Sequence, residues 1–236
     1  MKQLLIILLG ISFIFPAKAG DDPVCHARII NKRTYMNVSR EYPMEYWIAK
    51  DKYCYINNNQ IKTIVRKDLG VVYTILVKTN KYYVDSIKPQ QKLTEAGKEP
   101  DFKYIGLNYE PVYEWNKSHK LPKDTVANFV CDHFRSEGDA DFDQVSLEFS
   151  VARPGDRIVA AMFNETMVSI MGWMKTRKPL ADMLKRNKYL IPTRFIETVD
   201  NPIAPPVTTS FKLDKLEMTS PPENIFELPL GAEKEK

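Results

Sequence analysis

The sequence has few of the residues that build metal and redox sites. It contains three cysteines and three histidines among 236 residues, and it has no Cys-x-x-Cys pair. The lack of that pair argues against disulfide exchange and haem attachment. The histidines, His26, His119 and His133, are scattered, and their spacing to the cysteines matches no standard zinc pattern, which needs three or four converging ligands. We therefore predict neither a metal site nor another cofactor.

An excess of charge of one sign is also missing. The formal net charge of the whole chain is +4, and a near-neutral chain lacks the electrostatic field of a general nucleic-acid binder. Glycine is scarce, with nine residues against sixteen prolines, while aromatic residues make up 11%. This composition favours a sheet-rich protein with stiff connections and no nucleic-acid partner.

Long apolar runs are confined to the N-terminus. Lys2 precedes an apolar stretch from Leu4 to Phe15, and Ala17-Lys18-Ala19 forms a small-residue cleavage site before Gly20. That stretch is too short for a membrane span, which needs about 20 residues, so we predict a signal peptide at residues 1–19. Because Gly20 is not a cysteine, the usual bacterial lipid-attachment signature is absent. We expect a periplasmic or secreted product without a membrane span, and a single domain over residues 20–236.

The cysteines Cys25, Cys54 and Cys131 permit one disulfide and one free thiol in an oxidising compartment, and the sequence does not rank the three pairings. Cys131 lies two residues from His133, so the two side chains could act as a thiol nucleophile and its base. No family signature or oxyanion motif accompanies them, and we predict that the protein is not an enzyme. Enzyme activity would require two or more of Cys131, His133 and the nearby acidic residues to converge in one cleft.

Residues 27–87 alternate between strand-like segments and polar turns such as Asn57-Asn58-Asn59 and Asp68-Leu69-Gly70. The segments are too close together for crossover helices, which indicates an antiparallel meander. The predicted strands of this region span residues 27–36, 45–49, 53–56, 60–66, 71–77 and 81–87. Two further strands are expected at residues 126–135 and 145–151.

Helical periodicity begins after Asp156, which can cap a helix. An apolar stripe of this helix contains Val159, Met162, Phe163, Thr166, Met167, Ile170, Trp173 and Met174. Pro179 can start a second, shorter helix that ends near Arg186. Strands return at residues 189–199 and 211–218, separated by a proline-rich loop at 201–206. Beyond them, Phe226 and Leu228 are expected to clamp the edge of the sheet.

Several short motifs carry a resemblance to a known family. They are Tyr46-Trp47-Ile48, residues 64–73, residues 129–134, residues 188–194 and residues 220–229. Together they resemble an extracytoplasmic bacterial family of unknown function that shares the fold of the periplasmic lipoprotein carriers (LolA-like). The resemblance implies a mainly β, α+β fold, in which a curved antiparallel half-barrel sheet carries a two-helix insertion over its concave face. It also implies an apolar cavity that holds acyl chains.

The predicted function is therefore the binding of a lipid, a lipidated protein or another apolar ligand between the sheet and the lid helices. Methionine suits such a site because its thioether side chain repacks around variable guests. The rival interpretation is a structural or protein-interaction component of the cell envelope with a filled core, since any helix packed on a sheet shows the same apolar stripe. The candidate ligand-binding residues are Trp47, Tyr73, Tyr83, Met162, Met167, Ile170, Trp173 and Met174.

Overall fold

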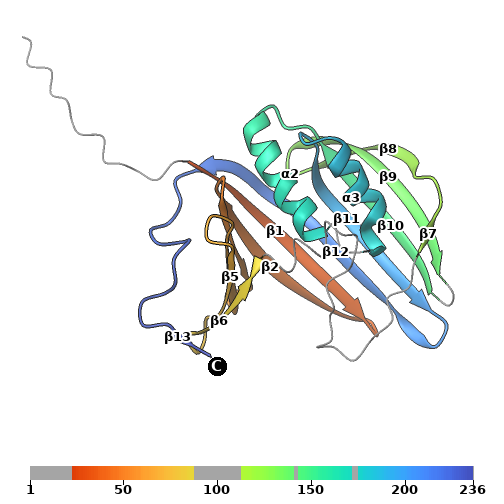
Figure 1. Ribbon diagram of the computed structural model, residues 1–236. Helices are drawn as coiled ribbons and strands as arrows, with labels where there is room; N and C mark the ends of the chain where they lie inside the picture. The colour runs from red at the N-terminus through yellow and green to blue at the C-terminus, as the bar shows by residue number, and fades with distance from the viewer. Residues whose placement is uncertain (1–22, 88–112, 141–142, 172–174, 236) are drawn as a thin grey trace, which may run out of the picture.

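One strongly curved antiparallel sheet dominates the protein (Figure 1). The computed structural model describes residues 23–87, 113–140, 143–171 and 175–235. The predicted signal peptide at residues 1–19 lies outside these ranges. In the described part of the chain, no helix has the length and apolarity needed to cross a membrane.

The strands follow the order β13-β6-β5-β4-β3-β2-β1-β12-β11-β10-β9-β7 across the sheet, and β8 also pairs with β9. Their bounds are β1 (Val24–Tyr35), β2 (Val38–Ile48), β3 (Lys52–Asn57), β4 (Ile61–Arg66), β5 (Val71–Leu76), β6 (Lys81–Ser86), β7 (Glu114–Trp115), β8 (His119–Val126), β9 (Phe129–Ala140), β10 (Asp143–Ala152), β11 (Ile191–Asn201), β12 (Ala204–Thr219) and β13 (Glu233–Lys234). The predicted meander over residues 27–87 is confirmed by the consecutive antiparallel pairs from β1 to β6.

Two hairpins are closed by two-residue turns in which both residues have positive φ. Met36 and Asn37 connect β1 to β2, with φ of 49° and 63°, and Ala127 and Asn128 connect β8 to β9, with φ of 49° and 67°. Positive φ at both positions is the geometry of a type I′ turn, whose twist matches that of the flanking strands. The prediction of one strand over residues 126–135 is therefore wrong, because the chain reverses at Ala127.

The strand β12 lies inside the sheet, between β1 and β11. The predicted loop at residues 201–206 is also wrong, because β11 continues to Asn201 and β12 already starts at Ala204. A register irregularity between Val199 and Asn201 accompanies the two prolines, Pro205 and Pro206. Proline in a sheet is confined to such irregular or edge positions, since it cannot donate a ladder hydrogen bond.

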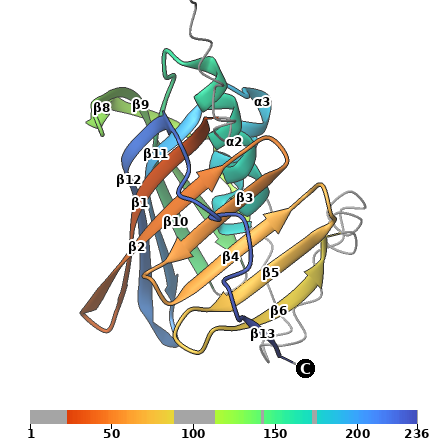
Figure 2. The same cartoon turned by 90° about the vertical axis from the view of Figure 1, so that its left-hand side faces the viewer.

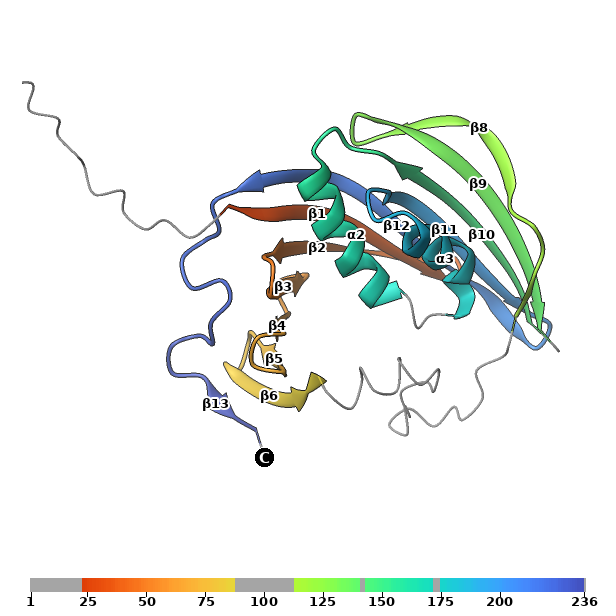
Figure 3. The same ribbon diagram turned by 45° about the horizontal axis from the view of Figure 1, so that its top comes forward.

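The helices α2 (Arg157–Met171) and α3 (Lys178–Arg186), with the short 3-10 helix η1 (Lys175–Arg177), lie over the concave face of the sheet (Figures 1 and 3). Asp156 caps α2, since its Oδ1 accepts hydrogen bonds from the amides of Ile158 and Val159 at 2.8 and 3.1 Å. The first helix was expected to include Met174, whereas α2 ends at Met171 and residues 172–174 lie outside the described ranges. The core beneath the helices combines Phe149, Phe163, Met167, Leu180, Leu184, Phe195 and Leu213.

The C-terminal residues 220–235 form a strap across the opposite, convex face of β2 to β6 (Figure 2). Ile225 and Phe226 are buried there in a second core with Val24, Trp47, Cys54, Ile64 and Ile75. The strap then adds β13 in parallel beside Lys81 and Tyr82 of β6. Phe226 is thus not an edge clamp, because it packs on the face of the sheet and the edge is covered by β13.

Candidate functional site

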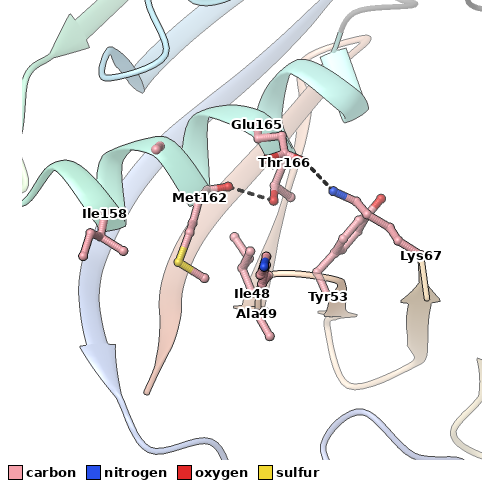
Figure 4. Close-up of a pocket in the computed structure, with 10 residues that line it drawn as sticks. Ile48, Ala49, Tyr53, Lys67, Ile158, Met162, Glu165 and Thr166 are labelled. Atoms are coloured by element: carbon pink, nitrogen blue, oxygen red, sulfur yellow. Dashed lines mark hydrogen bonds and ion pairs between the residues drawn. The ribbon is translucent and has the colours of Figure 1, made fainter. Parts of the chain in front are cut away.

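A pocket of about 310 Å³ lies between α2 and the turns that join β2 to β3 and β4 to β5 (Figure 4). Strand β2 ends at Ile48 and β3 starts at Lys52, so the intervening turn forms one wall. The first three turns of α2 form the other wall. The lining residues are Ile48, Ala49, Lys50, Tyr53, Lys67, Ile158, Ala161, Met162, Glu165 and Thr166.

The walls of the pocket are mainly apolar. Ile48 points from the concave face of β2, and Met162 faces it from α2 (Figure 4). Ile158 is 66% exposed at the end of the pocket and extends its apolar lining toward solvent. Thr166 donates its hydroxyl to the carbonyl of Met162 at 3.0 Å, so its polar atom is already satisfied within the helix.

Charged groups are gathered at the rim. Lys67 Nζ lies 2.6 Å from Glu165 Oε1, an ion pair that joins the β4–β5 turn to α2 (Figure 4). Burial raises the pKa of Tyr53 to about 12, and the neighbouring Tyr55 adds to this rise, while a hydrogen bond with Ser169 lowers it. Burial thus makes the already neutral Tyr53 hydroxyl still harder to ionise. The pocket therefore combines an apolar interior with two lysines and one glutamate at its opening.

The structure places the predicted helix residues in three different environments. Met162 lines the pocket. Met167 is only 1% exposed and belongs to the packed core, against which Ile170 is partly buried. Trp173 and Met174 lie outside the described residues.

The predicted sheet residues do not meet the helix residues at the pocket. Trp47 and Tyr73 face the strap on the convex side. Tyr83 is 41% exposed on β6, and it faces the concave side because its neighbour Tyr82 packs under the strap. Trp47 and Tyr73 thus lie on the face of the sheet opposite Met162, and Tyr83 is not among the residues that line the pocket. Ligand binding by these aromatic residues remains a prediction.

Sequence reasoning missed Ile48, Ala49, Tyr53 and Ala161. One signal for Ile48 and Tyr53 is that they flank the polar turn Lys50-Asp51-Lys52, so they can pair across the hairpin and share one face of the sheet, as they do. Ala161 carries a different signal. It is a small residue next to the apolar stripe of α2, where it leaves space that a larger side chain would fill.

The residues of the thiol hypothesis do not pair with each other. Cys131 is fully buried, and its Sγ lies 3.2 Å from both the carbonyl of Phe129 and Oγ1 of Thr193. His133 contacts Glu148 instead, with Nε2 3.0 Å from Oε1, and Arg194 Nη2 lies 3.0 Å from the same carboxylate oxygen. His133, Glu148 and Arg194 therefore form a partly buried polar network, and the Cys131 thiol has no imidazole partner among the residues that the structure describes.

All three cysteines have free, buried thiols. Cys25 faces the helices and Cys54 faces the strap, so the sheet itself separates them. Burial raises the pKa of both thiols to about 12. Within the described residues, no group of three or more His, Cys, Asp or Glu side chains is placed to hold a metal ion.

Comparisons with solved structures give matches of low identity and low TM-score. No protein-family model and no curated protein match the chain. Among solved structures, PNGF-II is 6% identical with a TM-score of 0.40, and the match covers 90% of this chain and 31% of that one. A DUF1329 family protein from Desulfovibrio piger is 8% identical over 88% of this chain and 91% of its own, with a TM-score of 0.33. A LolA superfamily protein from Nitrosomonas europaea is 5% identical over 86% of this chain and 89% of its own, with a TM-score of 0.32.

This chain spans about a third of the length of the PNGF-II structures. The curved open sheet and the helices on its concave face are the architecture that the sequence predicted for a LolA-like fold. The strand order and the helix packing confirm the predicted architecture, a mainly β fold with a curved sheet and two helices over its concave face.

Proposed function

We propose that this protein is an extracytoplasmic binding protein that holds an apolar chain of a lipid or a lipidated protein in the pocket between α2 and the β2–β3 turn. The observation that carries the proposal is the pocket itself, with Ile48 and Met162 on facing walls and charged groups only at the rim. The predicted signal peptide at residues 1–19 supports an extracytoplasmic location. The role of the protein is binding, and the proposal includes no catalytic step.

The size of the pocket suits a single acyl chain. Ligand pockets typically measure about 300 to 1,000 Å³, and this one, at about 310 Å³, is at the lower end. Each buried methylene contributes about 0.8 kcal/mol, so a chain of about ten methylenes gains about 8 kcal/mol. Ordering the chain opposes this gain, and we expect affinities no tighter than about micromolar.

Filling the pocket tests the proposal. Ala161→Phe places a ring in the pocket volume, and we expect it to weaken displacement of the neutral dye Nile red by lipids at least tenfold. Val130→Phe is the matched control, because Val130 is 68% exposed on β9 and far from the lining residues. Native mass spectrometry of protein purified from its own envelope should find bound lipid in the wild type and none in Ala161→Phe. Equal lipid binding by Ala161→Phe and the wild type would contradict the proposal.

A second candidate function is favoured by the packing of the interior. Phe163, Met167, Leu180 and Leu184 are fully buried and fill the space between the helices and the central strands. Such a filled core fits a structural or protein-interaction component of the envelope. Wild-type protein that is reproducibly free of lipid, together with capture of a defined envelope partner after cross-linking in cells, would support this second function.

A further inference from the structure

We propose that the pocket selects amphiphiles with an anionic head, and that Lys50 and Lys67 bind this head at the rim. The inference rests on the proposed function, since it names the chemical class of the ligand. The shared chemistry is a carboxylate or a phosphate joined to a single alkyl chain.

The two lysines lie on neighbouring turns. The amide of Lys67 donates to the carbonyl of Asp51 at 2.9 Å, which ties the β4–β5 turn to the β2–β3 turn that carries Lys50. Both lysines line the pocket together with apolar residues. Lysine can lay its aliphatic stem along such a wall and keep its ammonium in water. An alkyl chain in the pocket would thus end beside two ammonium groups.

The rim carries more positive than negative charge. Of its three charged side chains, only Glu165 is acidic, and it already pairs with Lys67. Lys50 forms no ion pair with any side chain that the structure describes. Because Glu165 is 70% exposed while Lys67 is 31% exposed, the carboxylate can swing into water and leave Lys67 in place for another anion. We infer that Glu165 occupies the head position when the pocket is empty.

Substitution of Lys67 and substitution of its ion-pair partner Glu165 should change the affinity for anionic ligands in opposite directions. Lys67→Met keeps the aliphatic stem and removes the charge, so the preference for an anionic head should fall. Glu165→Gln removes the competing carboxylate, so binding of anionic ligands should become tighter. A purely structural role of the ion pair would make both variants lose affinity.

The experiment measures displacement of Nile red by dodecanoate, dodecyl phosphate and methyl dodecanoate, which have the same chain length but differ in head charge. We expect the wild type to bind the two anionic ligands roughly tenfold tighter than the ester, the effect of about one charge-assisted hydrogen bond. Lys67→Met combined with Lys50→Met should bring this ratio close to one without changing ester binding. Lys120→Met is the matched control, since Lys120 lies on β8, pairs with Asp132 of β9 and does not line the pocket. Acetate and inorganic phosphate, as free anions without a chain, should displace no dye.

The outcomes separate the two proposals. Equal binding of acid and ester by the wild type would overturn the headgroup assignment and leave the apolar pocket standing. An equal loss of acid and ester binding in the lysine variants would also overturn it. Displacement of Nile red by inorganic phosphate would overturn the assignment of an amphiphile, because the site would then bind a free anion without an alkyl chain. If none of the alkyl probes displaces the dye, the proposed function fails together with this inference.

Discussion

Removal of the Phe226 ring tests whether the strap is an integral part of the fold. Phe226 is 7% exposed and packs in the second core of the convex face with Trp47 and Cys54. The ammonium of Lys52 also lies 4.8 Å from the centre of its ring. Phe226→Ala removes the ring and both kinds of contact, while the backbone of the strap stays intact.

The expected cost follows from these contacts. Truncation of a buried Phe to Ala costs about 3 to 5 kcal/mol. The lower end applies here, because a strap one chain thick can partly collapse into the space. The contact with Lys52 adds about 0.5 kcal/mol or more. We therefore expect the free energy of unfolding to fall by about 3 kcal/mol, which lowers the urea midpoint by about 1 M at a slope of about 3 kcal/mol/M.

Urea unfolding followed by far-UV circular dichroism measures this midpoint. Leu230→Ala is the control within the same strap, because Leu230 is fully exposed and its truncation should cost less than about 0.5 kcal/mol. A Phe226→Ala midpoint that equals the Leu230→Ala midpoint would refute the reasoning. It would show that the strap opens separately from the sheet.

Two further predictions concern packing and pH. Gly138→Ala should cost about 1 to 3 kcal/mol in thermal unfolding, because its new Cβ would lie 3.0 Å from the Trp115 ring, whereas Gly155→Ala meets nothing within 4 Å and should be near neutral. The raised pKa of the Cys25 and Cys54 thiols, about 12 in the folded protein against 9.0 normally, means that the folded state keeps protons that the unfolded state loses. The contribution of these two thiols to stability is complete below about pH 9 and is lost as the pH rises toward 12. The difference between the urea midpoints at pH 8 and pH 10.5 should therefore be smaller when both cysteines are replaced by alanine. An unchanged difference would contradict the raised pKa of the thiols.

The hairpins from β2 to β6 could be predicted because their signals are local, whereas the β1–β2 turn at Met36 and Asn37 was missed. Turn formers separate β3 from β4 and β5 from β6, and Asn58, Asn59 and Asn80 adopt the positive φ that asparagine tolerates. The β8–β9 turn was missed because alanine occupies its first position. A β-turn with Ala127 at positive φ depends on the pairing of the strands rather than on the preference of the residue.

The position of β12 could not be predicted from local signals. Consecutive strands are usually neighbours, and this tendency favours an edge position for the last long strand. In the structure β12 pairs with β1, a contact between residues almost the whole chain apart. Such pairing depends on the complementary length and faces of two strands, which no local pattern encodes.

Of the predicted ligand-binding residues that the structure describes, only Met162 of α2 lines the pocket, whereas the predicted strand residues do not, for a physical reason. Alternation identifies the two faces of a strand, yet it cannot say which face the helices cover when both faces are apolar. Trp47 and Ile48 are adjacent and both buried, one under the strap and the other under α2. Only the presence of the strap makes Trp47 a core residue of the convex side.

Trp47 and Ile48 connect the strap to the pocket, because they are adjacent on β2 and face opposite sides of the sheet. The β2–β3 turn that forms the pocket wall lies at the margin of the concave core, where α2 leaves Ile158 exposed. Its opposite face is held by Trp47 and Cys54, which pack against Phe226. Because side chains on the two faces of one strand share a backbone, we expect the burial that the strap provides on the convex side to restrict the position of Ile48 on the concave side. The C-terminal residues would then position one wall of the pocket although none of them lines it.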